Sequence, residues 1–492
     1  MAVLAPRSVE APLMRLRSLD GRAGWILLAV LWLGTRLIYL LNVMLGHHYP
    51  DPAFFLYGLK VSYGELPYRD FLVEYPPLGI LFIVLPGLAH AGPLTEWGYG
   101  SSFALEMLAL DLLTLFLVIR LAKGLIPGDR TGLYSGLLYT AFVAASGAIA
   151  QKFDLMAGTF CVVAVVALMR RRDGLAWVML VLATLTKGYP LALAPLFVLY
   201  RLMEGRAGWR GLYEGLRAAV VSSAVLTVPL MLVAGIQPLI DAVVYHVDRG
   251  TEIESVYSGL MLLGGRLFGI VTSSYANYGD QSQDILSPLN SLVDMIAVPL
   301  GVLLIGFLYW QFYRSLKARP EERDTALLRS TLLVLLAFMI TFRALPGHYL
   351  LAILPLAALV RFQDHRQRVF VLTLLGALLL GQLETVVWPQ LLAVQWVGIV
   401  ALNLRNAAIL ASFVLLLGGQ MRSFVPGAKA IGQRVTKVLP KASLGWAVES
   451  GIRSWQEVPT PFDSYREKAT TRPRTATLAQ QAHLMQRRNS VI

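Results

Sequence analysis

Residues 25–45 read WILLAVLWLGTRLIYLLNVML, an almost unbroken apolar run near the start of the chain. A helix needs roughly 20 mostly apolar residues to cross about 30 Å of hydrocarbon, so this run is long enough to span a membrane. It is also too long for the apolar core of a secretory signal, and it contains no small-residue cleavage motif. The run therefore predicts a retained first transmembrane helix, preceded by the basic residues Arg7, Arg15, Arg17 and Arg22.

Comparable apolar blocks recur along the chain. Examples are Phe103–Leu121, Ser222–Val233, Met295–Phe312 and Leu327–Ile340. Hydrophobic residues make up 56% of the 492 residues and charged residues only 15%, with a mean hydropathy of +0.60. A soluble domain needs more charge than this to cover its surface. The chain is therefore not a soluble protein, and we predict an all-α, polytopic transmembrane helix bundle with roughly ten to thirteen membrane segments before residue 420.

The net charge and the single cysteine further restrict the class of protein and the kinds of site it can contain. In a soluble protein, a formal net charge of +13 would suggest a nucleic-acid partner. Here the basic residues lie mostly in loops and in the C-terminal tail, where membrane topology explains them, so we expect no nucleic-acid partner. Cys161 lies inside an apolar block, and a single cysteine excludes an intrachain disulfide, a thiol pair and a zinc site built on cysteines.

Basic clusters set the predicted topology, because cytoplasmic loops are rich in Lys and Arg. They place the N-terminal segment 1–23 inside and the first loop, residues 46–75, outside, where it is long enough to form short interfacial helices. Later basic clusters lie at residues 120–130, 170–172, 201–217, 314–329 and 361–368. If all of them are cytoplasmic, five turns face outside: residues 151–154, 186–189, 245–258, 341–348 and 382–390.

Two further segments remain, one inside the predicted membrane domain, residues 24–420, and one after it. Residues 76–91 contain Pro76, Pro77 and Pro86, and a full crossing there would move the next two basic clusters outside. We therefore expect a re-entrant or partial segment, with a full crossing as the alternative. Residues 421–492 contain no further span and predict a basic cytoplasmic tail, in contact with anionic lipid at its start and disordered towards its end.

The predicted outer turns carry most of the candidate functional residues. Ionisable groups at a membrane edge are costly and are therefore functional candidates. They are Asp51, Asp70 and Glu74 in the first loop, followed by Lys152, Asp154, Lys187, Arg249, Glu252, Glu254, Arg343, His348 and Glu384. Carboxylates suit a general base, and cations suit a phosphate that leaves with negative charge. Sugar transfer from a lipid-linked phosphate at the membrane–water boundary needs both groups.

Each of these residues also has a simpler structural interpretation. In this interpretation, Asp51 caps a helix, Lys187 extends its ammonium group towards the interface, and Arg249 forms an ion pair with a nearby glutamate. His348 is then an ordinary loop histidine. The tyrosines of the first loop then belong to the aromatic belt at the membrane interface; they are Tyr63, Tyr68 and Tyr75. The coincidence of such residues in five separate turns of a chain with few charges favours a functional site.

Four stretches carry a resemblance to a known family. They are GELPYRDFLVEYPPL at 64–78, TKGYP at 186–190, YHVDRGTEIES at 245–255 and FRALPGHYLLAILP at 342–355. In this order, the stretches resemble the polyprenyl-phosphate-mannose-dependent mannosyltransferases of the GT-C fold, over most of residues 24–420. The resemblance implies a membrane helix bundle whose first outer loop of short helices carries the catalytic acid.

The resemblance also implies a reaction. A polyprenyl-phosphate sugar would donate a hexose, usually mannose, with inversion to a lipid or glycan acceptor at the outer face of a bacterial plasma membrane, among membrane lipids. The general base falls on Asp51, and because Pro52 directly follows it, Asp70 and Glu74 stay as rival bases. At Gly347-His348 the family more often has small polar residues and Gln, a departure that leaves the identity of the donor or acceptor open.

The other site residues follow from the same mechanism. Lys187, Arg249, Arg343 and Lys152 are expected to bind the donor phosphate, His348 to donate a hydrogen bond to it, and Tyr75, Tyr189, Glu254 and Tyr349 to contact substrate. We expect no nucleotide cofactor, because neither a P-loop nor a Rossmann fingerprint is visible. No metal ligand is assigned, although Asp51, Asp70 and Glu74 could hold a divalent cation, so metal dependence stays open.

Three alternatives stay open from the sequence. The first is a transferase of the same fold for another lipid-linked sugar, such as arabinose or glucose, or for mannose onto protein. The second is a lipid or sugar transporter, which would place charges near the bilayer midplane on broken helices of repeated halves. The third is an inactive scaffold. The outer position of the charges and the absence of an evident repeat favour an enzyme.

Overall fold

A computed structural model describes residues 21–46, 50–89, 94–125, 129, 131–277, 282–362 and 365–421. The predictions for the N-terminal residues 1–20 and for the tail after residue 421 lie outside these described residues. The described chain is predominantly helical, which confirms the predicted helical membrane fold.

Seven helices in the described ranges are long and apolar enough to cross a membrane. They are α2 (Arg22–Met44), α5 (Glu96–Ala122), α10 (Arg206–Ala234), α13 (Asn290–Ala318), α14 (Arg323–Thr341, with the 3-10 turn η2, Pro320–Glu322, before it), α16 (Arg366–Val386) and α18 (Trp396–Met421). Each of the apolar blocks quoted above falls within one of these helices, except that Leu45 is the C-cap of α2. Apolar length in the sequence predicts such helices because the membrane sets their minimum length.

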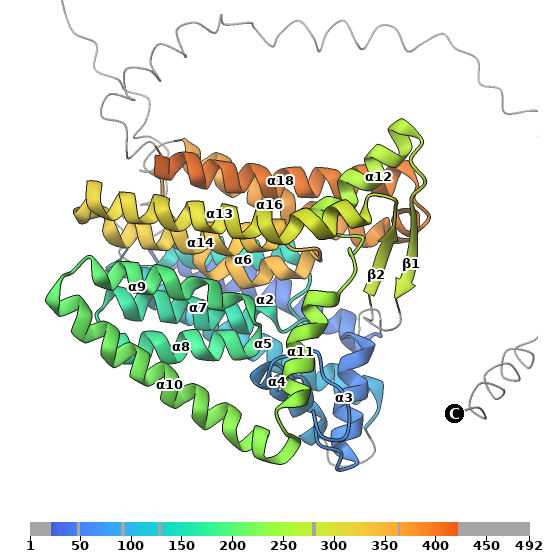
Figure 1. Ribbon diagram of the computed structural model, residues 1–492, viewed down its shortest axis with the longest axis horizontal. Helices are drawn as coiled ribbons and strands as arrows, with labels where there is room; N and C mark the ends of the chain where they lie inside the picture. The colour runs from blue at the N-terminus through green and yellow to red at the C-terminus, as the bar shows by residue number, and fades with distance from the viewer. Residues whose placement is uncertain are drawn as a thin grey trace, which may run out of the picture. The chain divides into compact units, whose positions relative to one another are not determined.

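Shorter helices fill the space between the long ones. They are α3 (Pro52–Ser62), α4 (Pro77–Leu88), α6 (Leu133–Ser146), α7 (Asp154–Met169), α8 (Asp173–Thr186), α9 (Ala194–Leu202), α11 (Gln237–Asp248), α12 (Val256–Phe268), α15 (Leu354–Ala357) and α17 (Trp388–Leu392), with the 3-10 turns η1 (Tyr189–Leu193) and η3 (Gly347–Ile353). Strands β1 (Ser273–Asn277) and β2 (Ser282–Leu286) form one antiparallel hairpin. Figure 1 shows α7, α8 and α9 alongside the long helices, whereas α3, α11 and the hairpin gather at one end of the bundle.

Large apolar side chains cover much of the outside of the long helices. Leu232 of α10 is 82% exposed and Leu303 of α13 is 72% exposed. In water such surfaces would drive aggregation, but in a bilayer they face hydrocarbon at no cost. The helices pack on one another through an apolar core and through close backbone contacts, as at Gly158 of α7, where an added Cβ would collide with the carbonyl oxygen of Ala352.

Charged side chains also occur inside the bundle. Arg36 of α2 and Asp111 of α5 are both buried and form an ion pair, with Arg36 Nε 2.8 Å from Asp111 Oδ2. Asp111 also accepts hydrogen bonds from Trp32 Nε1 at 2.7 Å and from the Tyr139 hydroxyl at 2.7 Å. This pair is therefore fully hydrogen-bonded and joins α2, α5 and α6, which is the role expected of a buried charge that has found its partners.

One end of the bundle, here called the basic end, joins the turns that the sequence predicts to be cytoplasmic. Arg201 pairs with Asp173 and with Glu204 at 2.5 Å each, and Glu204 also contacts Arg171 and Arg323. These contacts bring residues 170–173, 201–204 and 323 to the same place. Three of the five predicted cytoplasmic clusters therefore lie together, while their side of the membrane stays a prediction.

The opposite end, here called the loop end, contains the described residues of the first loop, 50–76, and the start of α5. The indole nitrogen of Trp97, at the start of α5, donates a hydrogen bond to the carbonyl of Met44, at the end of α2. Both ends of the intervening segment therefore lie at the same end of the bundle. Helix α4 has 12 residues and is about 18 Å long, well short of the hydrocarbon thickness. These observations agree with a re-entrant or partial segment.

Three details differ from the expected boundaries. The basic residues Arg210 and Arg217, expected in a loop, lie within the single 29-residue helix α10, because arginine is a good helix former. The expected turn at residues 382–390 is largely helical, and the chain reverses after α17 instead. The hairpin β1–β2 was not expected at all, since strands of five residues leave no trace in an analysis of long apolar blocks.

Candidate active site at the loop end

Asp51 has two simultaneous functions in the structure. It is the N-cap of α3, where its Oδ1 accepts a hydrogen bond from the Ala53 backbone N–H at 3.1 Å, and Pro52 occupies the first helical position. Its Oδ2 lies 2.9 Å from Lys152 Nζ. Burial raises the pKa of Asp51, but the charge and hydrogen bond of Lys152 outweigh it and hold the pKa below its ordinary value. The carboxyl is therefore ionised at neutral pH.

A second ion pair lies beside the first. Lys187, at the end of α8, places Nζ 2.9 Å from Asp154 Oδ1, and Asp154 is fully buried at the start of α7. His348 Nε2 is 3.9 Å from the other oxygen of Asp154. Three turns that are far apart in the sequence thus meet at one carboxylate. Lys187 also lies close enough to Asp51 to lower the pKa of that carboxyl.

Aromatic rings surround the Lys187 ammonium group. Its Nζ lies 4.7 Å from the ring centre of Tyr349, 4.9 Å from that of Phe153 and 5.8 Å from that of Tyr75. Such contacts attract a cation and exclude water from it, which strengthens its interaction with any anion that enters. Three aromatic rings and the Asp154 carboxylate therefore surround this ammonium group.

The third ion pair comes from the segment between α11 and α12. Arg249 and Glu252 are both buried, with Nη2 3.2 Å from Oε1, and Arg249 shares a hydrogen bond with the Tyr349 hydroxyl. Burial raises the pKa of Glu252, and Arg249 opposes this only in part. The expected structural pairing of Arg249 is therefore present, but it lies inside the cluster rather than on the surface.

The β-hairpin fixes this segment in position. Ile253 N–H donates to the Gln283 carbonyl at 2.7 Å, and Ile285 N–H donates to the Thr251 carbonyl at 2.9 Å. Asp284 is fully buried against Gly250, where an added Cβ would collide with its carboxylate. On the other side, Glu252 N–H donates to the Arg343 carbonyl at 2.9 Å. The segment is thus held between the hairpin and the turn after α14.

Glu74 and His246 form a further contact at the same end. The Tyr57 hydroxyl donates a hydrogen bond to Glu74 Oε2, and His246 Nε2 lies 3.0 Å from the Glu74 carbonyl oxygen. Burial raises the pKa of Glu74, and the hydrogen bond from Tyr57 offsets only part of the rise. Burial, together with the charges of Arg249 and Lys187, lowers the pKa of His246 to about 4. His246 is therefore neutral and donates from Nε2.

Arg405 forms the floor of the cluster and was not predicted from the sequence. It lies in α18, is fully buried, and places Nη1 2.8 Å from Glu384 Oε2 and 3.2 Å from Glu254 Oε1. The same Glu254 oxygen accepts the Gly347 backbone N–H at 3.1 Å. Arg405 therefore connects α16 and α18 to the turn that carries His348. A charge inside an apolar helix is the signal that could have revealed it.

Most of the residues singled out in the sequence meet in this cluster. Direct contacts or electrostatic effects on pKa connect Asp51, Glu74, Tyr75, Lys152, Asp154, Lys187, Arg249, Glu252, Glu254, His348, Tyr349 and Glu384. Sequence reasoning about site residues missed Tyr57, His246 and Arg405.

Three expected residues lie differently. Asp70 is exposed and bonds to its neighbour Arg69 and to the Leu66 N–H, within its own turn. The Arg343 side chain pairs with Asp294 at the start of α13, although its backbone contacts the cluster. Tyr189 lies at the edge of the cluster: its ring is against Phe338, 5.7 Å between ring centres, and Asp154 and Tyr349 act electrostatically on its hydroxyl. The structure therefore favours Asp51 and Glu74 over Asp70 by position.

The cluster can perform a definite kind of chemistry. It holds an ionised carboxylate beside Lys152 and Lys187, two further buried arginines, and hydroxyl groups of tyrosines, all at the edge of an apolar bundle. Such a set can accept a proton and stabilise an anionic leaving group. Among the described residues, no three His, Cys, Asp or Glu side chains are arranged to hold a metal ion.

Comparisons with known proteins give one similar structure and no family. No family model matches the sequence, and no curated protein matches it. A solved structure that resembles the fold is that of ArnT from Cupriavidus metallidurans bound to undecaprenyl phosphate, with 18% sequence identity and a TM-score of 0.40. The match covers 86% of this chain and 82% of that chain.

Proposed function

We propose that the protein is an integral-membrane glycosyltransferase that transfers a hexose, with mannose as the first candidate, from a polyprenyl-phosphate sugar to a lipid or glycan acceptor. The observation that carries this proposal is Asp51: a carboxylate kept ionised by Lys152 and placed next to the caged Lys187. A base and a phosphate-binding cation side by side at the edge of an apolar bundle are the two groups that this transfer requires.

The transfer is a single displacement. The acceptor hydroxyl attacks the anomeric carbon as its proton passes to the Asp51 carboxylate, the new carbon–oxygen bond forms, and the bond to the donor phosphate breaks. The phosphate leaves with the electron pair, which Lys187 and Arg249 stabilise, and the displacement inverts the anomeric carbon. His348 and Tyr349 lie where they can hydrogen-bond the same phosphate. We place this face of the protein outside the cytoplasm.

The buried cations of the site are stabilised by ion pairs. Lys152, Lys187, Arg249 and Arg405 each have a carboxylate partner within 3.2 Å. A buried cation without an anion would be strongly destabilising. Binding of a phosphate then competes with Asp154 and Glu252 for their cations. Glu252 is suited to release Arg249, because its raised pKa lets it take up a proton instead.

The first test is transfer of radiolabelled mannose from a short-chain polyprenyl-phosphate-mannose to a membrane lipid extract. We expect product with the wild type and a loss of about 10²–10⁴-fold in Asp51→Asn, the usual contribution of a general base. Glu65→Gln is the matched control, because Glu65 is a carboxylate of the same loop whose ion pair among the described residues is with Lys60, outside the cluster. It should keep wild-type activity.

Other outcomes redirect the proposal. Full activity in Asp51→Asn would move the base to Glu74 or Asp70, which the variants Glu74→Gln and Asp70→Asn separate. Charge reversal in Arg249→Glu should abolish transfer while the protein stays in the membrane, and wild-type turnover there would remove Arg249 from the site. The absence of product with folded wild type would contradict mannose as the sugar. Arabinose and glucose donors would then be tested in the same assay, followed by a transport assay.

A further inference from the structure

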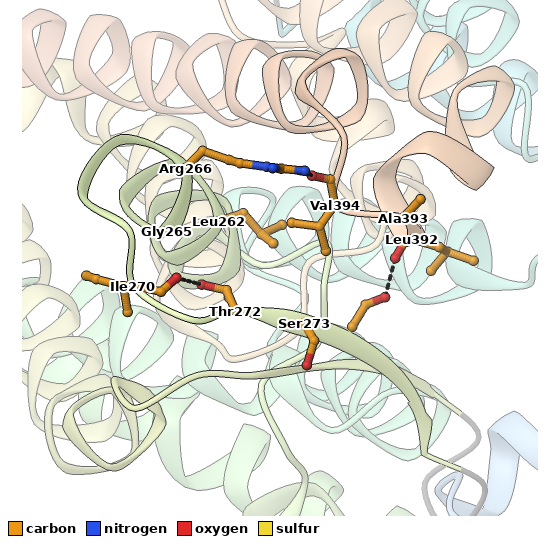
Figure 2. Close-up of a pocket in the computed structure, with 10 residues that line it drawn as sticks. Leu262, Gly265, Arg266, Ile270, Thr272, Ser273, Leu392, Ala393 and Val394 are labelled. Atoms are coloured by element: carbon orange, nitrogen blue, oxygen red, sulfur yellow. Dashed lines mark hydrogen bonds between the residues drawn. The ribbon is translucent and has the colours of Figure 1, made fainter.

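A cavity lies at the loop end, and none of the residues that line it belongs to the charge cluster. Its volume is about 430 Å³, within the range of small-molecule sites. One wall is the last part of α12, with Leu262, Gly265 and Arg266, and the opposite wall is the turn of residues 392–394 (Figure 2). Ile270, Thr272 and the first two residues of β1, Ser273 and Ser274, complete the lining.

Side-chain hydrogen bonds hold the two walls together. Arg266 Nε donates to the Val394 carbonyl at 2.9 Å, and its Nη2 donates to the same oxygen. Ser274 Oγ donates to the Leu392 carbonyl at 2.5 Å. Val394, a β-branched residue, has a φ of 52°, a conformation that such residues adopt only when the surroundings enforce it. The cavity is therefore built by specific contacts, which Figure 2 shows.

The polar groups of the cavity favour an anion with hydrogen-bonding substituents. Among the ion pairs of the described residues, Arg266 has no carboxylate partner, and no acidic side chain lines the cavity. Both bonds from Arg266 use Nε and Nη2, so Nη1 still has two N–H groups to offer. The Thr272 hydroxyl donates to the Ile270 carbonyl at 2.9 Å and can accept a hydrogen bond in turn.

The rim beside Arg266 is apolar and strongly exposed. Leu267 is 58% exposed, Phe268 is 79% exposed and Val271 is 81% exposed. A basic side chain followed at once by exposed apolar ones is the arrangement found where protein meets the boundary between lipid headgroups and acyl chains. A free phosphate ester would use Arg266 but would leave these three side chains in water.

We infer that this cavity binds the headgroup of an anionic phospholipid, with Arg266 on the phosphate, Thr272 on the polar headgroup, and Leu267, Phe268 and Val271 against the acyl chains. We take this lipid to be distinct from the sugar donor, because none of the residues that line the cavity belongs to the charge cluster. The inference does not depend on sugar transfer.

The test is lipid binding to the full-length purified protein, measured by native mass spectrometry with phosphatidylglycerol and phosphatidylcholine. In Arg266→Gln we expect phosphatidylglycerol to bind about fivefold more weakly, the effect of one arginine near an anionic headgroup, with phosphatidylcholine unchanged. Arg210→Gln is the matched control: Arg210 is an exposed helix arginine, 85% exposed in its side chain, at the basic end. It should bind both lipids like the wild type.

Two further measurements separate the sources of phosphate and keep the test decisive. Phe268→Ser removes an apolar contact and no hydrogen bond. It should therefore weaken the binding of phosphatidylglycerol and leave the binding of glycerol phosphate unchanged. Arg266→Lys, which keeps the charge, should retain most of the binding if Arg266→Gln proves misfolded. Three results would each overturn the inference. Phosphatidylglycerol could bind the wild type and Arg266→Gln equally, or Arg210→Gln could lose as much binding as Arg266→Gln. The third is that glycerol phosphate binds as tightly as the whole lipid.

Discussion

At the scale of single residues, the charged groups of the cluster have structural and chemical functions at once. Asp51 caps α3 with one oxygen and binds Lys152 with the other. A cap residue has a fixed position relative to its helix, so the same contact that starts the helix also aims the carboxylate. The cap interpretation and the catalytic interpretation of Asp51 therefore support each other, since a base must be held in place before it can act.

His246 offers a pH-dependent test of the cluster. Its pKa is about 4 in the folded protein, against an ordinary value of 6.5, so the unfolded chain binds more protons between these two values. Stability should therefore fall as the pH drops below about 6.5, and the loss should level off near pH 4. At pH 5 the loss from this one group is on the order of 1–2 kcal/mol, or a few degrees in Tm.

The variant His246→Gln isolates this effect, because the glutamine amide can still donate to the Glu74 carbonyl but does not titrate. We expect the fall in Tm between pH 7.5 and pH 5 to be a few degrees smaller in His246→Gln than in the wild type, in detergent micelles. His365→Gln, a change of an exposed histidine, should leave the fall unaltered. Identical pH profiles for His246→Gln and the wild type would show that His246 is not held neutral.

The sequence predicted which residues belong to the cluster better than it predicted their partners. Lys187, Arg249 and His348 stood out because charge is rare in this chain and collects at turns. Arg405 carried a comparable signal, a charge inside the apolar helix α18, but its partner Glu254 is 151 residues away. Pairs at such separations depend on how the helices pack, and a single sequence contains no measure of that.

At the scale of elements, the hairpin β1–β2 is what makes the segment of Arg249 and Glu252 rigid. Its strands have five residues each, and β1 is mostly exposed, so neither apolar length nor strict alternation marks them. They become strands because they pair with each other and with the 251–253 segment. Helices such as α5 and α13 were predictable because their apolar length alone determines them.

Gly250→Ala tests this dependence on the hairpin. The added Cβ would collide with the buried Asp284 carboxylate, which accepts hydrogen bonds from Asn277 Nδ2 and Ser282 Oγ. The carboxylate must therefore give up these bonds or β2 must shift, and we expect either change to displace Arg249. A displacement of about 1 Å can reduce turnover by roughly 10²-fold, with most of the protein still folded. Gly306→Ala in α13, where a Cβ meets nothing within 4 Å, should keep wild-type transfer and Tm.

The two alanine variants, compared in the same mannose-transfer assay, decide whether the hairpin positions Arg249. A loss confined to Gly250→Ala, with both proteins equally stable on heating, would show that the hairpin positions Arg249. Equal activity of both variants would mean that the hairpin tolerates the shift and does not hold the cluster in register.

At the scale of the whole molecule, the two ends of the bundle differ in kind. The basic end holds arginines paired around Glu204, and the loop end holds the cluster with Asp51, Lys187 and Arg249. The positive-inside rule then predicts the basic end in the cytoplasm. Helix lengths and contacts determine the axis of the bundle but not its direction across the membrane, so the direction needs its own experiment.

Cysteine labelling measures this direction, because the chain has one cysteine and it is buried. In a Cys161→Ala background, Tyr63→Cys places a thiol at the loop end, where Tyr63 is 78% exposed, and Arg210→Cys places one at the basic end. A membrane-impermeant maleimide should label Tyr63→Cys in intact cells and Arg210→Cys only after permeabilisation. The reverse result would put the candidate site in the cytoplasm, where an outer-face acceptor could not reach it. Labelling of both from the same side would contradict the bundle axis itself, since α10 starts at the basic end and residue 63 follows α3 at the loop end.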